Sequence, residues 1–262
     1  MNNNISIINR EIEFHELFED VNSREFARRV FSRPSVEYIN RLKQIGFEGL
    51  GRVLDAGCGF GQWAVALAQL NRMVISYDIS FERISLAAKI WNKTGQKNCM
   101  GFQSSLDNNC IKKQSMDAIF CYSSIYYCDY KKVISNFSQV LKRGGKLYLC
   151  SNGIGWYLYN LFNEHNPTVD FSNRQMAINT IVNTISHCSG GVLQKGVPII
   201  TPSENLEKCL IEYGFGNIEI KAESKINRSD TENESKAFFK GTYEDYEGVF
   251  EILCTKIEES GL

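Results

Sequence analysis

Several features that would assign this chain of 262 residues to a familiar class are missing. Basic and acidic residues nearly balance, 29 against 30, so the basic excess typical of nucleic-acid binders is absent. No apolar run approaches the length that spans a bilayer, and the first residues lack the basic and apolar regions of a signal peptide. We therefore expect a cytoplasmic protein that neither inserts into membranes nor binds nucleic acid.

Cysteine and histidine also lack the spacing of a metal site. The nine cysteines include no CxxC pair, and the three histidines, His15, His165 and His187, show no ligand-like pattern. We expect free thiols in a reducing compartment and no bound metal.

Residues 51–150 alternate short apolar strands with amphipathic helices. Strands are expected at 52–55, 73–77, 99–103, 117–121 and 146–150, and helices at 62–70, 81–92 and 130–141. Such alternation predicts an α/β fold with a Rossmann-like, seven-stranded, mostly parallel sheet and helices on both faces. The last two strands are expected at 217–221 and 248–256.

The flanking segments complete this organisation. Residues 1–50 indicate a helical N-terminal segment, with helices at 13–31 and 35–45. Residues 151–200 form an insertion with an aromatic stretch, 156–159, and a helix through 178–185, which we interpret as a helical lid. Residues 201–262 return to the core, and Thr201 to Glu204 are typical of a capping box that begins a helix.

A glycine-rich turn carries the main chemical signal. Val53 to Asp55 form a strand, Gly57, Gly59 and Gly61 follow at every second position, and a helix begins at once. Glycines let the backbone approach a ligand closely, and the helix N-terminus offers N–H groups to an anionic end. Alone, such a turn could equally be a tight strand–helix connection.

Asp78 strengthens the ligand interpretation. It ends the second expected strand, about 20 residues after the glycines, where a carboxylate can accept hydrogen bonds from ribose hydroxyls. The alternative is a helix N-cap, because a helix is expected from Phe81. A dinucleotide dehydrogenase would require Gly or Ala where Gln62 stands.

These segments resemble the class I S-adenosylmethionine-dependent methyltransferases. Val53 to Gly61 is similar to that family's D-x-G-x-G-x-G turn, Asp78-Ile79-Ser80 to its second-strand acid, and Val140 to Leu149 to its V-L-K-P-G-G-x-L segment. The resemblance implies S-adenosylmethionine as cofactor and residues 51–150 as the cofactor-binding core. Ser105 stands where the family usually has an acid near adenine. The positions implied to bind the cofactor are Asp55, Gly57, Cys58, Gly59, Asp78, Ile79, Ser105, Leu106, Cys121 and Tyr122.

The acceptor is expected beyond the fourth strand. Tyr122 to Tyr127 lack the D/N-P-P-Y/F sequence of enzymes that methylate nucleic acids, and resemble small-molecule methyltransferases instead. Tyr126, His165 and His187 are candidate catalytic residues, although Tyr126 could equally form a pocket wall and the histidines could be solvated.

Two functions from different classes remain open. The first is transfer of a methyl group to oxygen or nitrogen of a small-molecule acceptor. The second is a catalytically inactive, cofactor-binding regulatory or scaffolding subunit. The intact glycine turn and Asp78 favour the first. The sequence defines neither the acceptor nor the oligomeric state.

Overall fold

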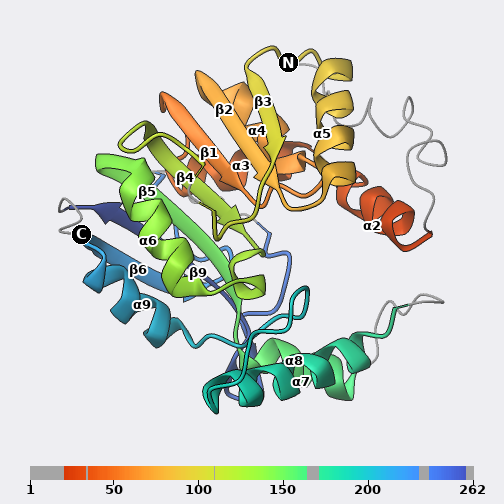
Figure 1. Ribbon diagram of the computed structural model, residues 1–262. Helices are drawn as coiled ribbons and strands as arrows, with labels where there is room; N and C mark the ends of the chain where they lie inside the picture. Colours follow the sequence, from red (N-terminus) through yellow and green to blue (C-terminus); the bar gives the residue numbers. More distant parts are fainter. Residues whose placement is uncertain (1–20, 34, 109, 164–170, 230–235, 258–262) are drawn as a thin grey trace. The chain divides into compact units, whose positions relative to one another are not determined.

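The computed structural model describes residues 21–33, 35–108, 110–163, 171–229 and 236–257 (Figure 1). The strands of the main sheet follow the order β3-β2-β1-β4-β5-β9-β6. The expected seven-stranded, mostly parallel α/β fold is confirmed. The chain divides into two compact units, Met1–Ser105 with Asn227–Lys236, and Leu106–Ile226 with Ala237–Leu262.

The first unit is a parallel three-stranded sheet with helices. Strand β1 pairs with β2, and β2 with β3, all in parallel. Helix α4 contacts all three strands, and α5 contacts β2 and β3. The elements are α2 (Val21–Phe31), α3 (Ser35–Gln44), β1 (Arg52–Ala56), α4 (Gln62–Leu70), β2 (Met73–Asp78), α5 (Phe81–Lys93) and β3 (Cys99–Gln103). Because parallel strands end at the same edge, the segments after β1, β2 and β3 come together there.

Asn71 ties the end of α4 to the segment that precedes β1. Its amide nitrogen donates to the carbonyls of Phe47 at 3.0 Å and Leu67 at 2.9 Å. Its amide oxygen accepts from the Leu50 N–H at 2.8 Å. The side chain is 8% exposed, so these bonds form away from bulk water. A single buried amide thus fixes how the chain enters β1.

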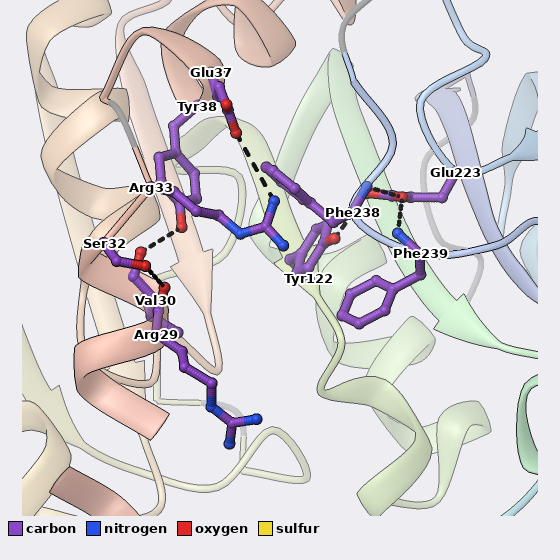
Figure 2. A network of polar contacts seen from close by, with 10 residues as sticks. All are labelled: Arg29, Val30, Ser32, Arg33, Glu37, Tyr38, Tyr122, Glu223, Phe238 and Phe239. Atoms are coloured by element: carbon purple, nitrogen blue, oxygen red, sulfur yellow. Dashed lines mark hydrogen bonds and ion pairs between the residues drawn. The ribbon is translucent and has the colours of Figure 1, made fainter. Parts of the chain in front are cut away.

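A hydrogen bond joins helices α2 and α3, and an ion pair lies beside it (Figure 2). The Tyr38 hydroxyl donates to the Val30 carbonyl at 2.9 Å, and Arg33 pairs with Glu37 at 3.8 Å. The Tyr38 ring packs edge-on against Trp63 of α4 at 4.7 Å. The helices expected before Gly51 are confirmed from residue 21 onward, and the earlier part of the first lies outside the described residues.

The second unit combines a parallel strand pair with an antiparallel extension. Strands β4 and β5 are parallel, and β9 runs antiparallel between β5 and β6. Its elements are β4 (Met116–Tyr122), η2 (Ile125–Tyr127), α6 (Tyr130–Val140), β5 (Leu141–Asn152), α7 (Ile154–Phe162), α8 (Asn173–Cys188), α9 (Ser203–Glu212), β6 (Phe215–Ala222), β7 (Thr242–Tyr243), β8 (Tyr246–Glu247) and β9 (Val249–Lys256).

Two local predictions in this unit were wrong. The strand expected from residue 146 already begins at Leu141, which pairs with Met116 ahead of a register shift, so helix and strand follow each other directly. The capping box at Thr201 does not form either. Helix α9 has Pro202 at its N-cap, and the Glu247 carboxylate accepts from the Ser203 N–H at 3.2 Å instead.

Helices α7 and α8 lie side by side after β5 (Figure 1). The helix expected through 178–185 is therefore present, but its apolar stripe is not buried. Ile178, Val182 and Ile185 are 38%, 60% and 62% exposed. Among the described residues, no helix combines the length and apolar character needed to cross a bilayer.

Candidate active site

The glycine turn after β1 is a tightly wound loop. Gly57, Gly59 and Gly61 all have positive φ, at 73°, 55° and 78°. The N–H groups of Gly57 and Cys58 both donate to the Tyr77 carbonyl, at 2.9 and 3.0 Å. The loop is thereby bound to the end of β2 and leads directly into α4.

Two of these glycines are needed for different reasons. A β-carbon at Gly61 would lie 2.8 Å from both the Ala87 β-carbon and the Trp91 ring nitrogen, so Gly61 allows α5 to pack closely. A β-carbon at Gly59 would meet no atom of the protein within 4 Å. Gly59 therefore leaves room beside the loop that no protein group fills, which is what close approach of a ligand requires.

The Asp78 carboxylate holds this loop from the end of β2. One oxygen accepts from the Gly59 N–H at 2.9 Å, and the other accepts from the Ser80 N–H at 2.9 Å. The N-cap of α5 is Ser80, whose hydroxyl accepts from the Arg83 N–H. The helix-cap alternative for Asp78 is therefore wrong. Each oxygen keeps a second lone pair that can accept a further hydrogen bond.

Asp55 supplies a second carboxyl group from β1. It is 2% exposed, and within the described part of the chain its Oδ2 has no hydrogen-bond partner. Burial, and secondarily the Asp78 carboxylate, raise the pKa of Asp55 from 3.8 to about 8. A neutral Asp55 can donate a proton as well as accept one, and its unpartnered oxygen fits a polar ligand group at this loop.

The end of β3 joins the same edge of the first unit. The Ser104 N–H donates to the Asp78 carbonyl at 2.9 Å, and the Gln103 amide donates to the Ile79 carbonyl at 3.0 Å. Ile79 is apolar yet 52% exposed, so it presents a surface suited to a flat ring. Ser105 follows directly, and the buried Leu106 belongs to the second unit.

In the second unit, Tyr122 at the end of β4 contacts a buried carboxylate (Figure 2). Its hydroxyl donates to Glu223 at 2.8 Å, and the other Glu223 oxygen accepts from the N–H groups of Phe238 and Phe239 at 2.7 and 3.0 Å. Burial raises the pKa of Tyr122 well above its usual range. The Cys121 thiol is buried 3.2 Å from the Ser124 hydroxyl.

The candidate catalytic residues lie in different surroundings. Tyr126 is buried in η2, where burial raises the pKa of its hydroxyl well above the usual range. His187 lies in the last turn of α8, and His165 lies outside the described residues. No group of three or more metal-ligating side chains occurs among the residues that the structure describes. All nine cysteines are free thiols.

The second unit contains a pocket, and the sequence indicated only one of its walls, the aromatic stretch 156–159. The pocket encloses about 130 Å³. Helix α7 contributes Trp156, Tyr159 and Asn160 to it. The segment 238–248, between β6 and β9, contributes most of the other walls, which include Phe238, Phe239, Lys240 and Tyr243. The aromatic stretch 156–159 was the only visible signal, because the facing segment has no periodic pattern.

Comparison with known proteins places this site in a family. Residues 53–145 match the family described as a methyltransferase domain. A malonyl-[acyl-carrier protein] O-methyltransferase from Hamiltonella defensa subsp. Acyrthosiphon pisum (strain 5AT) is 30% identical over 149 residues, which cover 52% of this chain and 55% of that protein. The chain spans 44% and 39% of two further curated methyltransferases that it matches.

Solved structures share the fold over most of the chain. A methyltransferase from Thermotoga maritima, described as a possible histamine N-methyltransferase, has a TM-score of 0.57 at 17% identity and covers 90% of this chain and 96% of that one. A geranyl diphosphate methyltransferase in complex with S-adenosylmethionine has a TM-score of 0.60 at 15% identity, over 93% and 95%. Residues 53–145 thus match a methyltransferase domain, and the chain shares its fold with methyltransferases, one of which is solved with S-adenosylmethionine bound.

Proposed function

We propose that this protein transfers a methyl group from S-adenosylmethionine to oxygen or nitrogen of a small-molecule acceptor. The observation that carries the proposal is the loop after β1. It combines unfilled space at Gly59 with the Asp78 carboxylate at 2.9 Å from the Gly59 N–H. The family match over residues 53–145 supports the same cofactor.

The first unit supplies groups that suit each part of this cofactor. The free lone pairs of Asp78 can accept hydrogen bonds from the ribose hydroxyls. The N-terminus of α4 faces the loop with N–H groups that suit the amino-acid carboxylate. Exposed Ile79 suits one face of the adenine ring, and Ser105 can hydrogen-bond its edge. When bound, S-adenosylmethionine supplies an electrophilic methyl group.

The second unit is proposed to hold the acceptor and receive its proton. Because burial raises the pKa of Tyr126 well above its usual range, Tyr126 stays protonated at neutral pH. It can orient an acceptor by donating a hydrogen bond, but it does not serve as a phenolate base. Of the candidate residues, His187 and His165 are therefore better suited to accept a proton from the acceptor. Residues 151–200 are proposed to cover the acceptor and exclude water.

Turnover with a matched pair of variants tests the proposal. Release of S-adenosylhomocysteine is measured on a panel of hydroxyl- and amine-bearing metabolites. Asp78→Ala should weaken binding of S-adenosylmethionine at least tenfold by leaving ribose hydroxyls unpaired. The control Glu48→Ala removes an exposed carboxylate that pairs with Lys43 and should leave affinity unchanged. Cofactor binding without turnover on any acceptor would favour the regulatory subunit, and equal affinity in both variants would refute the role of Asp78.

A further inference from the structure

Two side chains project from the glycine loop 57–61, those of Cys58 and Phe60, and both are buried, at 3% and 1% exposed. Phe60 lies between Gly59 and Gly61, whose φ angles are 55° and 78°. The Gly61 N–H donates to the Cys58 carbonyl at 2.9 Å, which closes a tight turn around Gly59 and Phe60. Because glycine adopts many backbone conformations, the packing of the Phe60 side chain helps to decide which one the loop holds.

Helix α2 packs against this side chain. The Phe26 and Phe60 ring centres are 5.6 Å apart, and the ring planes are tilted by 48°. Tilted aromatic pairs at this separation attract each other beyond the area that they bury. Phe26 itself is 46% exposed, so it lies at the edge of the core rather than within it. The ring of Phe26 therefore contacts the loop while contributing little to the buried core.

Helix α5 contributes a cation to the same ring. The Arg83 guanidinium lies 5.5 Å from the centre of the Phe60 ring, within the range of a cation–π attraction. The Arg83 N–H donates to the Ser80 hydroxyl, and the Ser80 N–H donates to the Asp78 carboxylate. Phe60 is thus contacted by two helices of the first unit, one of which begins at the segment that also holds the Gly59 N–H.

Helix α2 is anchored in the first unit, so the position of Phe26 is defined. Phe31, at the end of α2, is fully buried. The Tyr38 hydroxyl on α3 donates to the Val30 carbonyl at 2.9 Å (Figure 2), and the Tyr38 ring packs edge-on against Trp63 of α4. Helix α4 begins directly after the loop. The end of α2, the loop and the start of α4 therefore belong to one packed cluster.

We propose that Phe26 is a positioning residue for cofactor binding: through Phe60 it holds the loop 57–61 in the conformation that accepts S-adenosylmethionine. The proposal rests on the methyltransferase function above and gives α2 a part in it. That conformation places the Gly59 N–H 2.9 Å from the Asp78 carboxylate and leaves the space beside Gly59 unfilled. Without the Phe26 ring the loop should spend less time in it, and the apparent affinity for the cofactor falls with the fraction of competent protein.

Calorimetric titration of S-adenosylhomocysteine into the full-length wild type, Phe26→Ala and Phe26→Tyr tests the proposal. Phe26→Ala should weaken binding about three- to tenfold, the factor by which an aromatic pair shifts an equilibrium. Phe26→Tyr keeps the ring at a half-exposed position and should bind like the wild type. The control Val36→Ala removes an apolar side chain of similar exposure, 48%, from α3 and should leave the affinity unchanged. Equal affinity in Phe26→Ala and the wild type would overturn the proposal.

Two further measurements show whether Phe26 acts through the loop. In a Phe60→Leu background, Phe26→Ala should weaken binding no further, because the aromatic pair is already lost. Hydrogen exchange of the unliganded protein should be faster at residues 57–61 in Phe26→Ala than in the wild type, and unchanged in β3. The full loss of affinity in the Phe60→Leu background, unchanged exchange at residues 57–61, or exchange that rises equally in β3 would each overturn the proposal.

The wild-type titration separates this proposal from the methyltransferase function. Binding to the wild type with no difference in Phe26→Ala overturns the role of Phe26 and leaves the function intact. No binding to the folded wild type overturns the function, while faster exchange at residues 57–61 in Phe26→Ala would still show that Phe26 holds the loop.

Discussion

Replacement of Asp55 by asparagine should remove a pH-dependent loss of stability from the protein. In the folded chain the pKa of Asp55 is raised from 3.8 to about 8 by burial and by the Asp78 carboxylate. In the unfolded chain the group titrates near its usual value. Between about pH 4 and pH 8 the folded protein therefore holds a proton that the unfolded chain has released.

The sign of the effect follows from this proton. Because the folded state binds more protons than the unfolded state in this window, the free energy of unfolding falls as pH rises from about 4 to about 8, and it levels off above. At about 1.4 kcal/mol per pH unit, the free energy of unfolding can fall by at most about 4 kcal/mol between pH 5 and pH 8. Relaxation around a buried carboxylate reduces such limits, so we expect about 1–2 kcal/mol.

Urea unfolding of the wild type and Asp55→Asn at pH 5, 6, 7 and 8 measures this difference. With each step to higher pH, the free energy of unfolding of the variant should rise relative to that of the wild type. This holds whatever the difference between the two proteins at pH 5. Asp117→Asn is the control, since its partly exposed carboxylate pairs with Lys142 at 2.6 Å. Parallel profiles for Asp55→Asn and the wild type would show that Asp55 is ionised in the folded protein and would refute the reasoning.

Two further predictions concern the anchor before β1 and the absence of metal chemistry. Asn71→Ala removes three buried hydrogen bonds to Phe47, Leu50 and Leu67. Chemical denaturation should show that the free energy of unfolding falls by about 2–3 kcal/mol. The control Asn92→Ala, at an exposed position on α5, should lower it by only about a few tenths of a kcal/mol. Dialysis against a chelator should leave turnover unchanged, since methyl transfer by alignment needs no metal, and lost turnover with retained cofactor binding would contradict this.

The first unit could be predicted from sequence because its signals are local. The apolar strand 53–55, the glycine turn and the helix from Gln62 are all encoded within twenty residues, and they appear as expected. The position of Asp78 at the end of β2 also follows from periodicity. Its hydrogen bond to Gly59 does not, because that bond depends on how two parallel strands align.

The second unit was harder because its features depend on distant contacts. Hairpin β7–β8 turns at Glu244 and Asp245, with φ of 47° and 65°, where Asn-Gly would be the usual signal. Helix α9 is capped by Glu247 from that hairpin rather than by its own Thr201. The glycines at 153 and 155 permit close packing against β8, which no local pattern in the sequence indicates. The role of 151–200 as a lid stays a prediction.

The most direct test of the central claim is calorimetric titration of S-adenosylhomocysteine into the wild type, Gly59→Asn and Gly95→Asn. Asparagine tolerates positive φ, and a β-carbon at either glycine meets no protein atom within 4 Å, so both variants should fold. Gly95 lies in the turn after α5, away from the loop. The account predicts that Gly59→Asn loses affinity at least tenfold while Gly95→Asn binds like the wild type. No binding to the folded wild type, or unchanged affinity in Gly59→Asn, would contradict it.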